Sequence, residues 1–349
     1  MRGGPVIAIF VSGAVAMVIA IGLTPVLIGW LHKHGIGQPI REDGPEGHIT
    51  KAGTPTMGGV TIVIAAVLGY AAAHLMNGAI TTRSGVLALL TMAAAGAIGL
   101  ADDWIKVVNR RSLGLNKRWK FGLQLLMAVG FALAALRWVG IGTHLAYTRW
   151  NYPGIQLHQW GWAILAVLII TGATNAVNLT DGLDGLAAGS STFAFSALIV
   201  MGYWQFRHFP IYRLYHALDL ALLAAALAGA CAGFLWWNAA PARIFMGDTG
   251  ALAIGAGLAV LALEMNLHLL LPILGGLFVI ETLSVVVQVI SYRVFHRRVF
   301  RMAPLHHHFE LLGWPETTVI VRFWILAAAC TALALGLFYA DFLRFGTPG

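Results

Sequence analysis

Residues 5–31 read PVIAIFVSGAVAMVIAIGLTPVLIGWL, a run that contains no Asp, Glu, Lys or Arg. A helix needs about 20 apolar residues to cross a hydrocarbon core of about 30 Å, so this run is long enough to span a membrane. It is too long for the apolar region of a signal peptide, and more apolar runs follow it. The sequence therefore predicts a first membrane helix that is retained in the mature protein.

The rest of the chain has the same character. Its 349 residues are 59% hydrophobic and 10% charged, whereas soluble domains carry about 25% charged residues. In lipid, backbone polar groups must be satisfied within each segment, and long runs without alternation favour helices over barrel strands. We expect an all-α, polytopic membrane protein that forms a single domain over residues 1–349. The expected spans, about ten, lie near residues 5–31, 56–76, 85–102, 120–140, 160–177, 185–205, 217–237, 249–265, 269–292 and 318–340.

The net charge of +8 follows from membrane topology, and we expect no nucleic-acid partner. Ten spans place both termini on one face, and the opposite face holds twice as many Lys and Arg residues as the termini face. By the positive-inside rule the opposite face is cytoplasmic. Most of the acidic residues gather at this cytoplasmic face as well, which predicts a polar site there. The two cysteines, Cys231 and Cys330, lie in apolar segments and offer neither a disulfide framework nor a thiolate metal site.

Two adjacent acids, Asp102 and Asp103, end the third expected span. Carboxylates at the edge of hydrocarbon are costly to desolvate and need a cation or several donors. The pair therefore suggests a metal site. A helix end that meets water and pairs with Lys106 or Arg110 explains the pair equally well.

A polar stripe continues the fifth expected span. Asn175, Asn178, Asp181 and Asp184 recur at every third residue, so a helix would stack them on one side. Such a stripe at the mouth of a membrane helix indicates a functional site. A turn in which one Asp caps the next helix explains only one of the four.

Asn238 and the segment from Phe245 to Gly250 lie between the seventh and eighth expected spans. Asp248 is well placed to cap the helix that begins near Ala251. The same position brings the amide donors of a helix start close to any bound phosphate. Both interpretations are compatible.

His306, His307 and His308 lie in a basic loop before the last expected span. Three consecutive histidines point in different directions, which disfavours a zinc site. Arginines upstream make the loop a surface of donors for phosphate, although an amphipathic helix on anionic lipid would use the same arginines. Lys51 and Thr56 lie at the start of the second span and are candidates for binding a phosphate. They could equally be an interfacial lysine and a helix cap.

Carboxylates and cations at one membrane face suit a reaction between two phosphorylated species. Magnesium prefers oxygen ligands and is commonly held by one or two carboxylates together with substrate phosphates. Because a lipid phosphate resides at the bilayer edge, we expect a lipid phosphate and a water-soluble phosphate donor as the reactants.

Five motifs carry a family resemblance. They are Thr54 to Gly59, the Asp102-Asp103 pair with Lys106 and Gly114-Leu115, Asn175 to Gly185, Phe245 to Gly250, and Met302 to Glu310. With these motifs in this order, the chain resembles the phospho-N-acetylmuramoyl-pentapeptide transferases. These are bacterial peptidoglycan enzymes of the polyprenyl-phosphate N-acetylhexosamine-1-phosphate transferase superfamily.

The resemblance implies transfer of phospho-N-acetylmuramoyl-pentapeptide from its uridine diphosphate (UDP) conjugate to undecaprenyl phosphate, which yields lipid I and uridine monophosphate (UMP) and requires Mg²⁺. It implies a multi-pass protein of the bacterial inner membrane with a cytoplasmic site, periplasmic termini and membrane lipid as a partner. The oligomeric state stays open, with a homodimer among the arrangements allowed.

Carried onto this chain, the resemblance makes Asp248 a metal ligand, Asp102 the carboxylate that activates the lipid phosphate, and Asp103 a support for metal or phosphates. It places Asn178, Asp181, Asp184 and Phe245 around the uridine, with Phe245 stacking and Asp184 at the uracil edge. His306, with a catalytic role, and His307 and Lys51 would contact phosphate or sugar. Further candidates for substrate binding are Thr56, Asn175, Asn238 and His308.

Two alternatives remain. A related transferase would use UDP-N-acetylglucosamine, although the histidine triplet and the Thr54 to Gly59 motif favour the muramyl donor. An ion-coupled transporter also buries carboxylates, but transporters place their site near the midplane between repeats. Here the acids lie at one edge, with Glu281 as the main exception.

Overall fold

The computed structural model describes residues 4–34, 53–109 and 114–345. Within this part of the chain, ten helices are long and apolar enough to cross a membrane, which confirms the expected all-α membrane fold. The ten helices are α1 (Gly4–Lys33), α2 (Gly59–Asn77), α3 (Arg83–Val108), α4 (Lys117–Ala134), α5 (His158–Thr180), α6 (Leu186–Arg207), α8 (Ala217–Asn238), α9 (Gly247–Glu264), α11 (Gly276–Phe295) and α13 (Glu316–Phe345).

Short elements connect these helices. A π-helical turn, η2 (Ala135–Val139), continues α4, and the antiparallel strands β1 (His144–Arg149) and β2 (Tyr152–Gln156) form a hairpin that the sequence did not predict. The remaining elements are α7 (Phe209–Tyr212), α10 (Leu271–Leu274) and α12 (Leu305–Glu310). The ninth span begins at Gly276, later than the expected residue 269, because Pro272 in α10 and the Gly275-Gly276 pair interrupt the helix.

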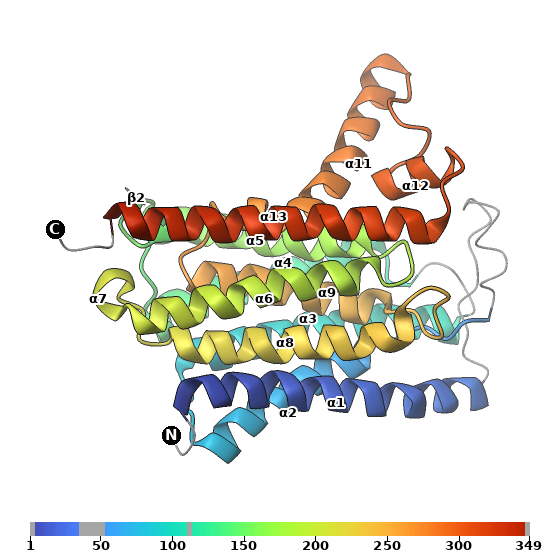
Figure 1. The fold of residues 1–349 in the computed structure, drawn as a ribbon. Helices are drawn as coiled ribbons and strands as arrows, with labels where there is room; N and C mark the ends of the chain where they lie inside the picture. The colour runs from blue at the N-terminus through green and yellow to red at the C-terminus, as the bar shows by residue number, and fades with distance from the viewer. Residues whose placement is uncertain (1–3, 35–52, 110–113, 346–349) are drawn as a thin grey trace.

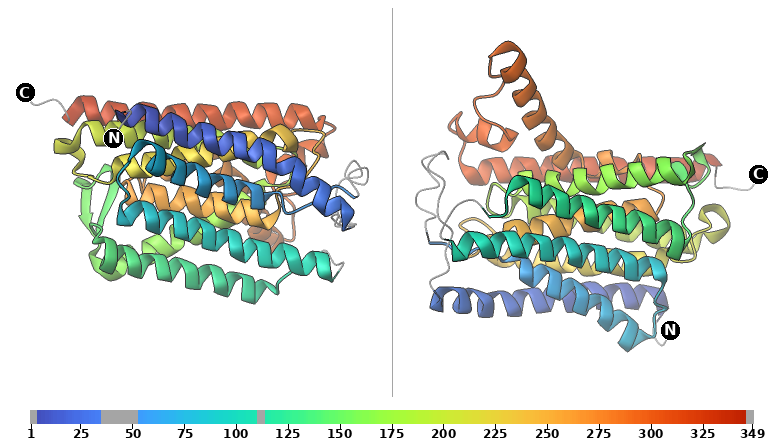
Figure 2. Two further views of the ribbon diagram at one scale, coloured as in Figure 1. Left: turned by 90° about the horizontal axis from the view of Figure 1, so that it is seen from below. Right: turned by 180° about the vertical axis from the view of Figure 1, so that it is seen from behind.

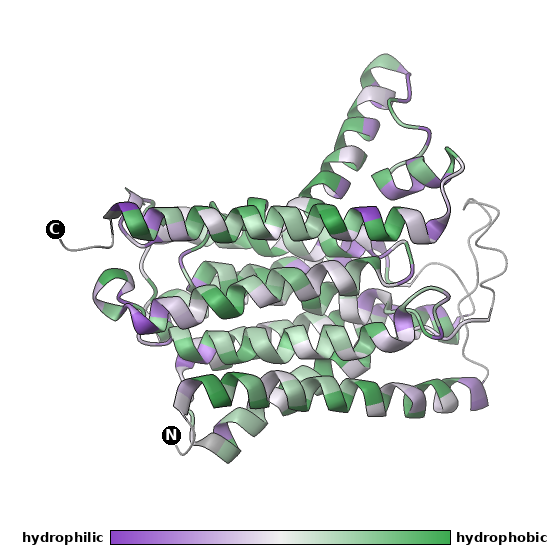
Figure 3. Cartoon of the chain, viewed as in Figure 1, coloured by the Kyte–Doolittle hydropathy of each residue, from purple (hydrophilic) through white to green (hydrophobic). Residues whose placement is uncertain are grey.

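Both termini lie at one end of the bundle, as ten spans require (Figures 1 and 2). We call this the termini end and the opposite end the far end. Hydrophilic residues gather mainly toward the two ends, and the length between them is predominantly hydrophobic (Figure 3). The helices therefore run across the apolar layer rather than along its surface.

The core of the bundle is built from α8 and α9. In their apolar windows 83% and 94% of the residues are buried, against 22% in both α1 and α11. Alanine and glycine dominate both central helices, which lets the helix backbones approach closely. α1 and α6 pack on α8, and α3 and α5 pack on α9. α11 leans out of the bundle and carries α12 beside it at the far end (Figure 1).

The crossing of α3 and α9 depends on a glycine. A methyl group at Gly99 of α3 would overlap the backbone of Asp248 and Thr249 at the start of α9. Because the obstacle is main chain and not a flexible side chain, the two helices would have to separate. Gly99 therefore sets how closely the ends of α3 and α9 meet.

Replacing Gly99 by Ala is expected to lower the free energy of unfolding by about 1–3 kcal/mol, the usual cost of overpacking. Thermal unfolding of the purified protein in detergent measures this loss. The matched control is Gly130→Ala in α4, where a methyl group meets no atom within 4 Å. Equal melting temperatures for both variants would show that the α3–α9 contact tolerates the extra methyl group.

Candidate active site

Three carboxylates meet at the far end of the bundle. Asp102 and Asp103 come from the penultimate turns of α3, and Asp248 comes from the first turn of α9. Their oxygens lie within 4.8 Å of one another, and all three residues are buried. The structure thus brings together two motifs that are far apart in the sequence. We call these three residues the carboxylate cluster.

Asp103 caps α9 from the neighbouring helix. Its Oδ1 accepts the N–H of Asp248 at 3.1 Å, and its Oδ2 accepts the N–H of Thr249 at 3.0 Å and the Thr249 hydroxyl at 2.7 Å. The first N–H groups of a helix have no partner within the helix and attract a negative charge. Gly247 has a left-handed φ of +72°, which is favourable for glycine, and a Cβ at this position would meet Asp103 Oδ2 at 2.6 Å. Asp103 therefore holds the start of α9 beside α3.

Replacing Asp103 by Asn is expected to cost about 1–3 kcal/mol of stability, because the new amide N–H group would face donors instead of accepting from them. Thermal unfolding measures the loss, and Thr249→Val, which removes only the hydroxyl donor, should cost less. An Asp103→Asn protein as stable as the wild type would contradict the capping role.

Asp102 is held differently. Its Oδ1 accepts the N–H of Leu115 at 2.9 Å, and its Oδ2 lies 2.7 Å from Lys106 Nζ and 3.8 Å from Lys120 Nζ. A methyl group at Gly114 would overlap the backbone and the carboxyl of Asp102, so this glycine allows the chain to pass closely over it. Asp102 keeps one oxygen directed toward the lysines.

Two ammonium groups partly neutralise the cluster. Lys106 of α3 pairs with all three carboxylates, at 3.4 Å from Asp103 and in direct contact with Asp248. Lys120 of α4 lies 2.9 Å from Asp248. Three carboxylates against two ammonium groups leave an excess of negative charge. Because all three acids offer oxygen atoms, the donor set suits a hard divalent cation such as Mg²⁺.

The predicted pairing of Lys106 with the two acids is confirmed, whereas Lys120 was not among the predicted site residues. Lys106 had a signal, since it follows Asp102 by four residues and a helix places such residues on one side. Lys120 had none, because its position depends on how α4 packs against α3.

The polar stripe of α5 reaches the cluster at one residue. Asn178 donates its amide N–H to Asp248 Oδ1. Asp181 follows at the end of α5, where burial, reinforced by the carboxylates of Asp248 and Asp103, raises its pKa to about 8. Asn175 is exposed, and its Nδ2 donates to Gln124 Oε1 of α4 at 2.9 Å and to the carbonyl of Thr171 at 2.8 Å.

Asn238 and Asp184 tie two loops together. Asn238 accepts the N–H of Gly185 at 3.1 Å and donates to the carbonyl of Ile244 at 2.9 Å. Asp184 Oδ2 accepts the N–H of Ala242 at 2.9 Å. These bonds fix the turn after α5 to the loop before α9. Asn238 thus uses both ends of its amide to hold backbone.

Phe245 and Thr56 lie on two segments that bond to each other. The N–H of Phe245 donates to the carbonyl of Pro55 at 2.8 Å, and its carbonyl accepts the N–H of Gly58 at 2.9 Å. Thr56 is buried beside Gly247, and the Phe245 side chain is half-buried. Both residues therefore neighbour the start of α9.

The three histidines have three different environments. His306 is fully buried, with Nδ1 3.2 Å from Glu281 Oε2 and its ring against Gly182. His307 Nδ1 lies 2.6 Å from Glu310 Oε2. His308 Nδ1 accepts the N–H of Arg301 at 3.1 Å, which orders the loop upstream of α12. Lys51 lies outside the described residues.

Comparison with known proteins shows where the chain belongs. A model of glycosyl transferase family 4 matches residues 85–266, and a phospho-N-acetylmuramoyl-pentapeptide-transferase signature matches residues 51–63. The phospho-N-acetylmuramoyl-pentapeptide-transferase of Frankia alni is 49% identical over 99% of both chains. The enzymes of that name from Saccharopolyspora erythraea and Kineococcus radiotolerans are 48% and 45% identical, over 96% of this chain and 98% of theirs. The chain belongs to the phospho-N-acetylmuramoyl-pentapeptide transferase family.

Membership in the phospho-N-acetylmuramoyl-pentapeptide transferase family confirms the resemblance seen in the sequence. The match extends well beyond the five motifs, since it covers nearly the whole chain, including both ends of the bundle. The predicted roles of single residues stay predictions. Among the predicted site residues, Asp102, Asp103 and Asp248 form the carboxylate cluster, and Asn178 donates to Asp248.

Proposed function

We propose that the far end of the bundle transfers phospho-N-acetylmuramoyl-pentapeptide from its UDP conjugate to undecaprenyl phosphate and thereby makes lipid I for peptidoglycan. The observation that carries this proposal, together with family membership, is the carboxylate cluster paired with Lys106 and Lys120. Because the face without the termini holds twice as many Lys and Arg residues, the far end would face the cytoplasmic side of the bacterial inner membrane, with the termini on the periplasmic side.

The reaction exchanges one phosphoanhydride bond for another. An oxygen of the lipid phosphate attacks the phosphorus attached to the muramyl sugar, and the bond from that phosphorus to the oxygen of UMP breaks, so UMP leaves with the electron pair. Most of the catalysis is positioning and neutralisation of charge. We assign Asp102 to accept a proton from the lipid phosphate, and Lys106 and Lys120 to contact the phosphate oxygens.

Mg²⁺ fits the cluster, because Asp248 and Asp102 offer carboxylate oxygens while Asp103 is engaged by the N–H groups of α9. We assign Asp248 as its main ligand. When bound, the ion neutralises the phosphates and stabilises the leaving UMP. Asn178 donates to Asp248 and so orients this carboxylate.

The uridine would lie between the two loops that Asn238 and Asp184 tie together, near Phe245, Asp181 and Asn178. Loops fixed by hydrogen bonds from the Asn238 and Asp184 side chains to the backbone form a preorganised wall for a flat base. We assign the remaining predicted binding residues to the surroundings of the bound donor. They are Asn175, Thr56, His307, His308 and Lys51. His306 is fully buried against Glu281, so we assign it a positioning role under the Gly182 turn.

The test uses purified protein with the UDP-linked muramyl pentapeptide, undecaprenyl phosphate and MgCl₂. We expect release of UMP that requires all three components. A competition with UDP-N-acetylglucosamine is included, and preferential use of that donor would overturn the substrate assignment. Loss of UMP release with EDTA, restored by Mg²⁺, is the expected behaviour of the cluster.

A further inference from the structure

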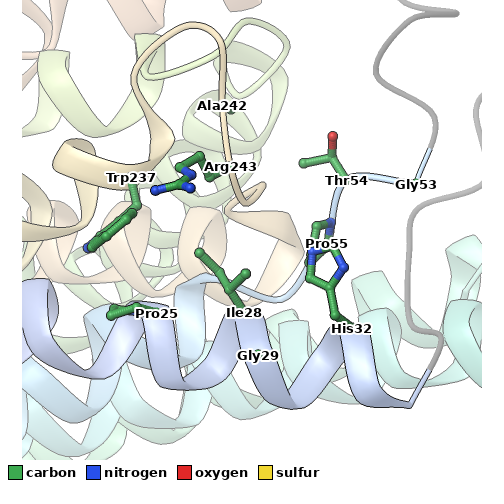
Figure 4. Close-up of a pocket in the computed structure, with 10 residues that line it drawn as sticks. All are labelled: Pro25, Ile28, Gly29, His32, Gly53, Thr54, Pro55, Trp237, Ala242 and Arg243. Carbon is green, nitrogen blue, oxygen red and sulfur yellow. The ribbon is translucent and has the colours of Figure 1, made fainter.

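A cavity of about 600 Å³ opens at the far end of α1, and none of its lining residues belongs to the carboxylate cluster. Its walls come from α1, residues 53–55, the last turn of α8 and the loop after α8 (Figure 4). Pockets of this volume accommodate small ligands or parts of larger ones.

A chain of contacts fixes one wall before any ligand arrives. Pro25 in α1 has no N–H, so the carbonyl of Ile21 lacks its helical donor. The indole N–H of Trp237 donates to that carbonyl at 2.9 Å. The guanidinium carbon of Arg243 lies 5.3 Å from the centroid of the same indole, and the N–H of Arg243 donates to the carbonyl of Trp237 at 2.9 Å. The cation is therefore presented on a fixed aromatic surface.

The residues near the pocket are those expected at the level of lipid headgroups. Trp30 of α1 is 45% exposed and Trp236 of α8 is 70% exposed, both close in sequence to its lining residues. Exposed tryptophans gather at membrane–water interfaces. The last turn of α1 contains His32 and Lys33, which also marks the end of the apolar layer.

The lining combines positive charge with apolar surface. Arg243 and His32 are exposed, and Ile28 and Pro55 supply apolar contacts (Figure 4). The lining residues include no Asp or Glu, and none of the ion pairs in the described part of the chain involves Arg243. Arginine recognises phosphate through its planar fork of donors. We propose that this pocket binds the phosphate headgroup of an anionic membrane phospholipid.

A bound headgroup would steady the neighbouring catalytic segments. Two walls of the pocket are residues 53–55 and the loop after α8. Hydrogen bonds of Phe245 with Pro55 and Gly58 join these two segments. These segments carry Thr56 and Phe245 toward α9. We therefore expect the bound lipid to lower the KM for the UDP-linked donor, a consequence that rests on the proposed function.

The test is native mass spectrometry of the full-length protein in detergent micelles that contain phosphatidylglycerol or phosphatidylcholine. We expect the wild type to retain one phosphatidylglycerol in preference to phosphatidylcholine. Arg243→Ala should weaken that retention roughly tenfold, the effect of losing a charge-assisted contact. Arg243→Lys should retain it in part. The matched control is Arg207→Ala, which removes an exposed arginine from the last turn of α6 at the termini end, away from the pocket.

Equal retention of phosphatidylglycerol by the wild type and Arg243→Ala would overturn the proposal. Displacement of the lipid by UMP or by inorganic phosphate would also overturn it, because the pocket would then serve soluble phosphates. The lipid count does not depend on transfer, so it stands apart from the activity assay. In nanodiscs, a donor KM that rises in the Arg243→Ala variant and not in Arg207→Ala would support the coupling.

Discussion

Asp248→Asn is expected to lower kcat for UMP release by roughly 10²–10³-fold, the scale seen when an enzyme loses a group that stabilises transition-state charge. The substitution keeps the volume of the side chain and its place at the start of α9. It removes the negative charge that faces Lys106, Lys120 and the assigned Mg²⁺. We expect the Mg²⁺ concentration for half-maximal activity to rise as well.

The matched control is Asp341→Asn at the termini end. Asp341 is also a buried carboxylate paired with a cation, with Oδ1 3.2 Å from Arg149. This variant should lose stability and keep its kcat. If both variants lost activity equally, the loss would reflect general damage to the bundle, and the special role of Asp248 would be unsupported.

Asp102→Asn is expected to reduce kcat by a similar factor, roughly 10³-fold, because the proton of the lipid phosphate loses its acceptor and general-base catalysis contributes 10²–10⁴-fold. The KM values for both substrates should change little. The N–H of Leu115 still has the amide oxygen as a partner, so we expect the fold to remain.

The comparison of Asp102→Asn with Asp103→Asn separates chemistry from architecture. The first should lose kcat at nearly unchanged melting temperature, and the second should lose melting temperature through the freed N–H groups of α9. A reversed pattern, with Asp103→Asn stable and inactive, would exchange the roles of the two acids.

The sequence predicted the spans well because each one is a long apolar run that has no alternative in lipid. The sequence also predicted that Asp102, Asn178 and Asp248 lie at one face of the bundle, because alternating spans bring the end of α3, the end of α5 and the start of α9 to the same face. The third span was predicted to end at the acids, whereas α3 continues to Val108. The pairing of Lys106 with the acids offsets the desolvation cost of burying their carboxylates within α3.

Other features depend on packing between distant segments. The cap of α9 by Asp103 requires the close approach that Gly99 permits, and no local pattern encodes it. The position of Lys120 depends on how α4 meets α3. The contact of the buried His306 with Glu281 also gives a physical reason for an acid inside α11. In the sequence, Glu281 was only an exception to the rule that the acids lie at one membrane edge.

The position of a bound divalent ion tests most directly whether the cluster holds metal between two phosphorylated reactants. Crystals or frozen particles of the protein with Mn²⁺ and the UDP-linked donor would locate it, in the crystal through anomalous scattering. We predict an ion in contact with the Asp248 carboxylate and with donor phosphate oxygens. An ion and nucleotide bound at the termini end, or at the far end without contact to Asp102 or Asp248, would contradict this assignment.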